Sequence, residues 1–165
     1  MSQRKGKLFF FCGKMAAGKS TLSRQLVSQE HAVLLVEDEF LERLFPGQIV
    51  DIAAYVTCSS RIRDALAPHI VALLAMGVSV VLDFPGNTRS QRAWFRRLID
   101  DAGVEHELHF VDATNTLCLS QLRHRSKDLP PDRLWTGEAE FLAITAYFEP
   151  PAAEEAFNVV RHERA

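Results

Sequence analysis

The sequence lacks the features that would mark a secreted, membrane or nucleic-acid-binding protein. Its 165 residues include three cysteines, Cys12, Cys58 and Cys118, without a CxxC spacing, so we expect reduced thiols and a cytoplasmic location. Nothing at the N-terminus resembles a signal peptide, and the apolar runs are too short or too interrupted to span a bilayer, so we expect no membrane partner. The formal net charge of −2 argues against a basic nucleic-acid-binding surface.

The length fits a single domain over residues 1–165. Short apolar runs alternate with longer helix-like segments, which predicts a three-layer α/β domain with a parallel sheet. The predicted strands are Leu8–Cys12, Ala32–Val36, Val78–Asp83, Glu107–Asp112 and Phe157–Arg161. The predicted helices are Lys19–Gln29, Tyr55–Met76, Arg89–Ala102, Thr116–Arg125 and Glu138–Phe148.

One segment, "GKMAAGKS" at Gly13–Ser20, fits the phosphate-binding loop pattern G-x-x-x-x-G-K-[ST] between a predicted strand and a predicted helix. Gly13 and Gly18 allow successive backbone N–H groups to surround a phosphate. Lys19 supplies a charge for the β- and γ-phosphates, and the Ser20 hydroxyl can ligate Mg²⁺. The predicted nucleotide-binding residues are Gly13, Lys14, Met15, Ala16, Ala17, Gly18, Lys19, Ser20 and Thr21.

Two classes of P-loop protein fit the rest of the sequence poorly. A GTPase switch would carry an N-K-x-D or T-K-x-D element that reads guanine, and the chain has none. Its DxxG match, "DFPG" at Asp83–Gly86, contains only two fixed residues. A motor ATPase would end a later strand in Asp-Glu, but Asp83 is followed by Phe84. The pair Asp38–Glu39 follows the first strand after the phosphate-binding loop, which is earlier than such ATPases usually carry it.

A small-molecule kinase needs a carboxylate near the acceptor hydroxyl, a metal-binding aspartate and arginines that cover the phosphates. Asp38 and Asp83 end the second and third predicted strands, so we expect both at the carboxyl edge of the sheet, where ligands bind in open α/β folds. Ser20 and Asp83 are the predicted metal ligands. The predicted catalytic residues are Asp38, Lys19, Arg123, Arg125 and Arg133, the arginines lying beside or within a proline-broken segment, 126–138, that we expect to form a closing lid.

The order of these motifs resembles that of the adenylate-kinase-like P-loop kinases. "EDEF" (Glu37–Phe40) is similar to the acidic segment after strand two in zeta-toxin and chloramphenicol-phosphotransferase-type kinases. "LDFPGNTRSQ" (Leu82–Gln91) resembles the "LDGFPRT" stretch of nucleoside monophosphate kinases, without its arginine after the proline. The closing stretch, Glu140–His162, is similar to short bacterial ATP-binding proteins described as AAA-family ATPases. The resemblance implies the P-loop NTPase fold with strand order 2-3-1-4-5, an acceptor region at about 41–76 and a general-base role for Asp38.

We therefore expect a phosphotransferase that uses ATP and Mg²⁺ and acts on a small-molecule hydroxyl acceptor. The alternative is a nucleotide-binding or regulatory NTPase that hydrolyses ATP without a separate acceptor. Arg61 and Arg63 fit either an acceptor contact or a solvated helix face. Arg92, Arg96 and Arg97 are predicted to lie on a helix surface.

Overall fold

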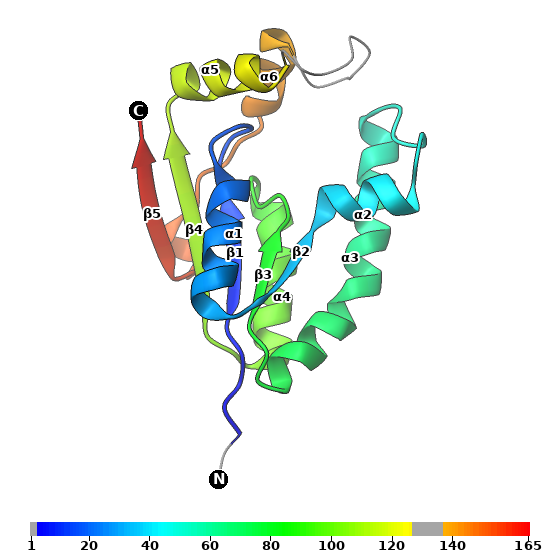
Figure 1. The fold of residues 1–165 in the computed structure, drawn as a ribbon, viewed down its shortest axis with the longest axis vertical. Helices are drawn as coiled ribbons and strands as arrows, with labels where there is room; N and C mark the ends of the chain where they lie inside the picture. Colours follow the sequence, from blue (N-terminus) through cyan, green and yellow to red (C-terminus); the bar gives the residue numbers. More distant parts are fainter. Residues whose placement is uncertain (1–2, 127–136) are drawn as a thin grey trace.

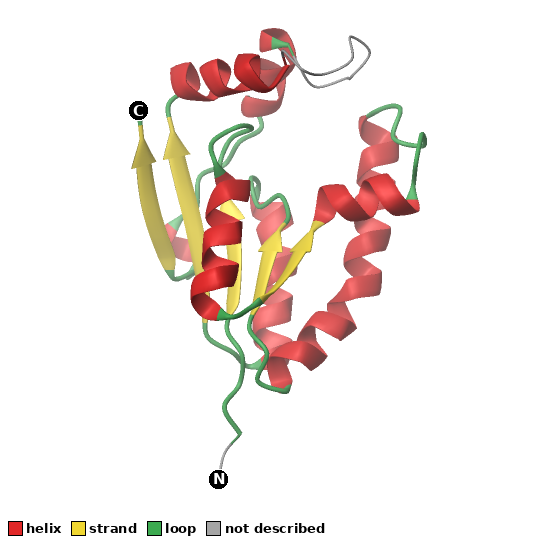
Figure 2. Ribbon diagram, in the orientation of Figure 1, coloured by secondary structure: helices red, strands yellow, loops and turns green. Residues whose placement is uncertain are grey.

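The computed structural model describes residues 3–126 and 137–165, and a parallel sheet lies at its centre (Figures 1 and 2). The strands are β1 (Leu8–Cys12), β2 (Val33–Val36), β3 (Val80–Asp83), β4 (His106–Ala113) and β5 (Val159–Arg164). They lie in the order β2-β3-β1-β4-β5, and each neighbouring pair is parallel. The predicted fold class and strand order are therefore confirmed.

Helices cover both faces of the sheet, which gives the three predicted layers (Figure 1). The helices are α1 (Lys19–Glu30), α2 (Glu37–Leu44), α3 (Ile52–Ala75), α4 (Arg89–Ala102), α5 (Asn115–Ser126) and α6 (Glu138–Thr145), with a 3₁₀ turn η1 (Ala153–Glu155). α1 packs on one face through Leu26, and α3 and α4 cover the other. Within the described part of the chain, no helix is long and apolar enough to cross a bilayer.

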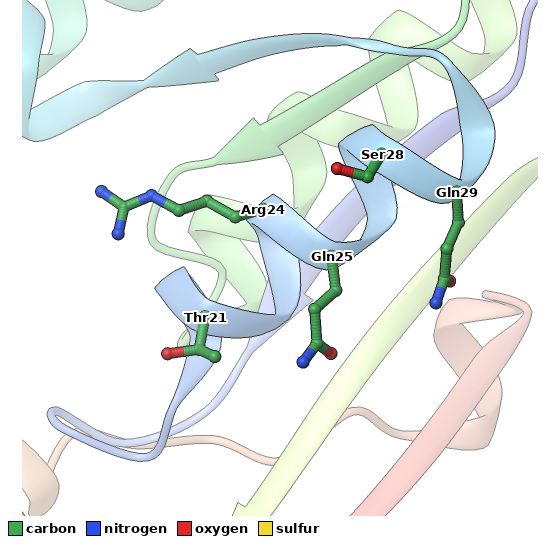
Figure 3. A pocket seen from close by; sticks show the side chains of 5 residues that line it. All are labelled: Thr21, Arg24, Gln25, Ser28 and Gln29. Carbon is green, nitrogen blue, oxygen red and sulfur yellow. The ribbon is translucent and has the colours of Figure 1, made fainter.

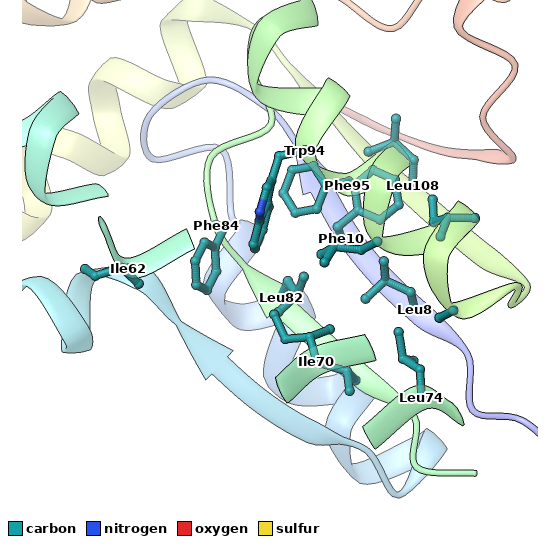
Figure 4. Close-up of a cluster of buried hydrophobic side chains, with 14 of the residues drawn as sticks. Leu8, Phe10, Ile62, Ile70, Leu74, Leu82, Phe84, Trp94, Phe95 and Leu108 are labelled. Carbon is teal, nitrogen blue, oxygen red and sulfur yellow. The ribbon is translucent and has the colours of Figure 1, made fainter. Parts of the chain in front are cut away.

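The central strand β1 is buried on both faces, which explains its uninterrupted apolar sequence. Leu8 and Phe10 pack toward α3 and α4 (Figure 4), while Phe9 and Phe11 pack toward α1. The ring of Phe10 stacks on that of Phe95 from α4, with 4.4 Å between centroids. These contacts fix β1, and therefore the loop that follows it, between two packed layers.

The ends of α3 and α4 are set by side-chain caps. The Thr88 hydroxyl accepts a hydrogen bond from the Gln91 N–H at 3.1 Å, so α4 begins where the sequence predicts. The Asp51 carboxylate accepts a hydrogen bond from the Ala54 N–H at 2.7 Å, so α3 begins earlier than predicted. α6 is shorter than its prediction and ends at Thr145.

The sequence does not predict α2. This short helix carries Glu37, Asp38 and Glu39 in its first turn and Arg43 in its last, which complements the helix dipole. β2 ends at Val36, so Asp38 lies in the first turn of α2 and not at the end of the strand as predicted. It still lies just beyond the carboxyl end of β2.

The predicted surface position of Arg92 is wrong, because its side chain is fully buried. Its Nε and Nη2 bind the two Glu155 carboxylate oxygens at 2.8 and 3.0 Å. Arg96 donates to the backbone oxygens of Glu155 and Ala156, both at 2.9 Å. Arg97 is exposed, as predicted. The prediction fails at Arg92 because Glu155, which is remote in the sequence, pairs with the buried cation. The residues of α4 alone would leave that cation without a partner.

Candidate functional site

The candidate site is the carboxyl edge of the sheet, where all five parallel strands end. The phosphate-binding loop follows β1, α2 follows β2, Asp83 ends β3 and α5 follows β4. Figure 1 shows α5 and α6 above this edge and the α2–α3 pair to one side of it. The predicted site residues therefore come from several segments to one edge of the sheet.

The phosphate-binding loop has the backbone geometry that its glycines allow. Gly18 has a φ of 108°, a conformation that favours glycine, and α1 begins at the next residue. A side chain at Gly13 would lie 2.9 Å from the Val111 backbone oxygen. The Gly13 N–H donates to the Asn87 side-chain oxygen at 2.9 Å. Asn87 thus supports the loop, a role that the sequence does not reveal because the two residues are far apart along the chain.

The other loop residues serve as packing and anchoring groups. Ala16 and Ala17 are buried and pack, with Met15, against side chains of α5. The Lys14 ammonium donates to the Asn115 side-chain oxygen at 2.8 Å, which ties the loop to the start of α5. Thr21 is exposed on α1.

The Lys19 ammonium lies over the loop itself. It donates to the backbone oxygens of Gly13 and of Lys14, the latter at 3.0 Å. Burial lowers the pKa of Lys19 to about 8, against the opposing charge of Asp83. Lys19 is half-buried. A phosphate bound in the loop would favour the charged lysine and raise its pKa again.

Ser20 and Asp83 are in direct contact. The Ser20 hydroxyl donates to the Asp83 Oδ2 atom at 3.1 Å, across the gap between the start of α1 and the end of β3. A hydroxyl and a carboxylate are hard oxygen ligands of the kind that Mg²⁺ prefers. Among residues 3–126 and 137–165, no group of three or more His, Cys, Asp or Glu side chains could hold a metal ion. A Mg²⁺ ion at Ser20 and Asp83 would thus need further oxygens from phosphate and water, which is its usual mode of binding.

Asp38 lies close enough to this pair to interact with it electrostatically. Desolvation, followed by the negative charges of Glu37 and Asp83, raises the pKa of Asp38, and the Lys19 ammonium opposes the rise. Asp38 is nevertheless exposed to solvent. The structure therefore brings Asp38, Asp83 and Lys19 into one electrostatic cluster.

A buried polar network fixes the start of α2, which carries Asp38. The Glu37 carboxylate accepts hydrogen bonds from the Tyr55 hydroxyl at 2.6 Å and from the Ser59 hydroxyl at 2.9 Å. The Arg63 guanidinium lies 3.6 Å from Glu37 and stacks 5.0 Å from the centroid of the Trp94 ring. Arg63 is thus largely buried, and the solvated helix face does not describe it, whereas Arg61 is exposed.

The predicted arginines are placed only in part. Arg123 is exposed and forms an ion pair with Glu138 at 3.1 Å, which joins the end of α5 to the start of α6. Arg125 is exposed, and its charge helps to lower the pKa of Lys19, which places it within electrostatic reach of the loop. Arg133 and most of the predicted lid, 126–138, lie outside the described residues.

Two cavities lie near the loop. One, of about 470 Å³, adjoins its outer side and is lined by Lys14, Asp112, Ala113, Thr114, Glu163, Arg164 and Ala165. The other, of about 440 Å³, lies along the outer face of α1 (Figure 3) and is lined by Thr21, Arg24, Gln25, Ser28 and Gln29. Each cavity shares one residue with the predicted site, Lys14 in the first and Thr21 in the second.

A family model described as an AAA domain matches residues 8–151. The chain belongs to this family. The matched residues include the phosphate-binding loop, Asp38, Asp83 and the arginines of α5, and so most of the candidate site. A search of curated proteins finds no significant match.

Solved structures similar to this AAA domain confirm its fold. A protein from Chloroflexus aurantiacus has a TM-score of 0.74 at 17% identity, over 97% of this chain and 89% of that one. The APS kinase of Mycobacterium tuberculosis, in complex with AMPPNP and APS, has a TM-score of 0.62 at 19% identity, over 97% and 89%. A gluconokinase from Sinorhizobium meliloti has a TM-score of 0.59 at 16% identity, over 96% and 83%. The AAA domain therefore has a P-loop kinase-like fold.

Proposed function

We propose that the protein is an ATP- and Mg²⁺-dependent phosphotransferase that acts on a small-molecule hydroxyl acceptor. The observation that carries the proposal is the meeting of Lys19, Ser20, Asp83 and Asp38 at one edge of the sheet. A phosphate site alone would need the first two residues. The two carboxylates add a metal ligand and a group for the acceptor hydroxyl.

In this proposal the loop backbone and Lys19 hold the β- and γ-phosphates. Lys19 exchanges its contacts with the Gly13 and Lys14 oxygens for phosphate oxygens. Ser20 and Asp83 would hold Mg²⁺, which when bound neutralises charge on the phosphate oxygens. Arg125, and Arg133 of the proposed lid at 126–138, would add positive charge as that segment closes over the phosphates.

Asp38 is proposed to act on the acceptor. An ionised carboxylate accepts the proton of the hydroxyl as its oxygen attacks the γ-phosphate, and a raised pKa makes the carboxylate a stronger base. The Glu37 network holds the backbone of α2 and so fixes the direction from which Asp38 approaches. The acceptor would lie against the helical region at about 41–76. We also propose that residues 1–165 form a single domain. A cytoplasmic location is part of the proposal, because the three buried free cysteines suit a reducing compartment.

Replacement of Asp38 by asparagine tests the proposal, because it keeps size and polarity but removes the proton acceptor. We expect near-normal ATP binding by calorimetry and a loss of acceptor phosphorylation of about a hundredfold or more. The control is Glu39→Gln, which removes an exposed carboxylate from the same helical turn and should leave both measurements unchanged.

Full acceptor phosphorylation by Asp38→Asn would contradict the role of Asp38. If the unaltered protein releases ADP at the same rate with and without every acceptor tried, the NTPase alternative replaces the kinase.

A further inference from the structure

Arg164, the last residue of β5, reaches the phosphate-binding loop from the far end of the chain. Its Nη1 atom donates to the Ala17 backbone oxygen at 2.7 Å, across 147 positions of sequence. The strand fixes this position, because Arg164 pairs with Ala113 of β4 and its backbone oxygen accepts from the Thr114 N–H at 3.1 Å. The pairing of β5 with β4 therefore holds Arg164 beside Ala17.

The guanidinium lies against the peptide from which α1 starts. A side chain at Gly18 would lie 2.0 Å from the Arg164 Nη1 atom, so the arginine occupies the space beside that glycine. Successive N–H groups at a helix start are the donors that bind phosphate. Arg164 thus brings a positive charge to the place where the loop's own donors begin.

The remaining donors of Arg164 are available for a ligand. A guanidinium has five N–H groups, and among the described residues Ala17 is the hydrogen-bond partner of this side chain. Arg164 also lines the cavity of about 470 Å³ beside the loop, together with Lys14. A group that enters this cavity can therefore accept hydrogen bonds from the remaining N–H groups of the Arg164 guanidinium.

The local charge favours an anion there. Two acids, Asp112 and Glu163, line the same cavity, but Arg161 forms ion pairs with both of them. The charges of Lys14 and Arg164 have no such carboxylate partner among the described residues, because Lys14 donates to amide and carbonyl oxygens and Arg164 to a carbonyl. The cavity is therefore positive on the side that adjoins the loop.

We propose that Arg164 is a nucleotide-binding residue whose guanidinium donates to a phosphate oxygen of the bound nucleotide while it holds the Ala17 carbonyl. The inference rests on the proposed function, because it takes the loop to be a nucleotide site. It adds a cation from the last strand to those of the loop and of α5.

Calorimetry of ADP and ATP binding to Arg164→Gln tests this inference. We expect the Kd of both nucleotides to rise by about tenfold or more, the effect of losing one charge-assisted hydrogen bond. The dependence of log Kd on salt should become shallower, because one phosphate-binding charge is gone. Arg164→Lys, which keeps the charge, should restore part of the affinity and the salt dependence. Arg97→Gln removes an exposed arginine from α4 and should change neither quantity.

Two results would overturn the inference: a Kd within about twofold of the unaltered protein, or an unchanged salt dependence despite a weaker Kd. The second result, or the first together with a lower melting temperature, would mean that Arg164 only supports the loop. Lys19→Ala distinguishes these results from failure of the proposed function. If Lys19→Ala abolishes binding but Arg164→Gln does not weaken it, the inference fails alone; if Lys19→Ala binds nucleotide normally, the nucleotide site itself is wrong.

Discussion

Replacement of Arg92 by alanine should destabilise the protein more than any change to an exposed ion pair. The buried guanidinium of Arg92 binds both Glu155 oxygens, and it also donates to the backbone oxygens of Gly86 at 2.9 Å, Glu149 at 2.8 Å and Pro150 at 3.3 Å. One side chain thus joins the loop after β3 to the segment between α6 and β5. Burial alone would raise the pKa of Glu155, but the Arg92 hydrogen bonds prevail and lower it.

The expected cost follows from the partners that Arg92→Ala leaves behind. Breaking a buried ion pair by removing one member costs about 3–5 kcal/mol, and here the Glu155 carboxylate, whose side chain is 12% exposed, would lose its main partner. In a chain of 165 residues, each 1 kcal/mol lowers the melting temperature by about 2–4 °C, so the expected fall is about 6–20 °C. The matched control is Arg89→Ala, whose ion pair with Glu154 spans 3.5 Å between side chains that are 53% and 75% exposed. That pair should contribute less than about 1 kcal/mol.

Urea denaturation and thermal melting, followed by circular dichroism, measure both variants. Arg92→Lys should lie between Arg92→Ala and the unaltered protein, because a lysine keeps the charge but cannot bind both carboxylate oxygens in the same plane. A loss below about 1 kcal/mol for Arg92→Ala, equal to that of Arg89→Ala, would refute the reasoning.

Three further predictions concern the loop and the sheet. Nucleotide affinity should fall as the pH rises from about 8, the pKa of Lys19 without nucleotide, towards the ordinary value of 10.5. Over this range the lysine of the free protein loses its proton, whereas bound phosphate keeps the lysine charged. Calorimetry of Lys19→Met should show no such dependence on pH. Gly18→Ala should raise the nucleotide Kd by about tenfold or more and cost about 1–2 kcal/mol of stability, because a φ of 108° and Arg164 oppose a side chain there; normal binding would contradict this. Burial lowers the pKa of His109, whose Nδ1 atom lies 2.9 Å from His162 Nε2, so the free energy of unfolding should fall as the pH drops below the ordinary value of 6.5, and less so in His162→Gln.

The sequence predicts β1, β2 and β3 because these strands carry nearly continuous apolar runs, whereas β4 and β5 are interrupted by polar residues. β1 is the clearest example, since "LFFFC" is buried at every position. The strand order came from the family resemblance, because periodicity does not say which strands are neighbours. The sequence does not predict α2, because its eight residues include four acids and follow β2 without a turn signal.

The sequence indicates those parts of the candidate site that follow from the motif, and it misses contacts that depend on distant pairing. Gly18 and Lys19 are recognisable from the loop pattern, and Asp83 from its place at the end of a strand. Asn87 and Arg164 hold the loop through hydrogen bonds that only the folded sheet creates. Arg92 has the sequence surroundings of a surface arginine, and its burial depends on Glu155 from a separate segment.

The most direct test of the central claim is ADP release by the unaltered protein with ATP and Mg²⁺, measured with and without acceptors from a panel of sugars, nucleosides, antibiotics and oligonucleotide 5′ ends. A phosphotransferase should release ADP faster with at least one acceptor, and the γ-phosphate should appear on that compound by mass spectrometry. An ADP release that is the same with every acceptor, with all phosphate recovered as inorganic phosphate, would contradict the claim and identify the protein as an NTPase.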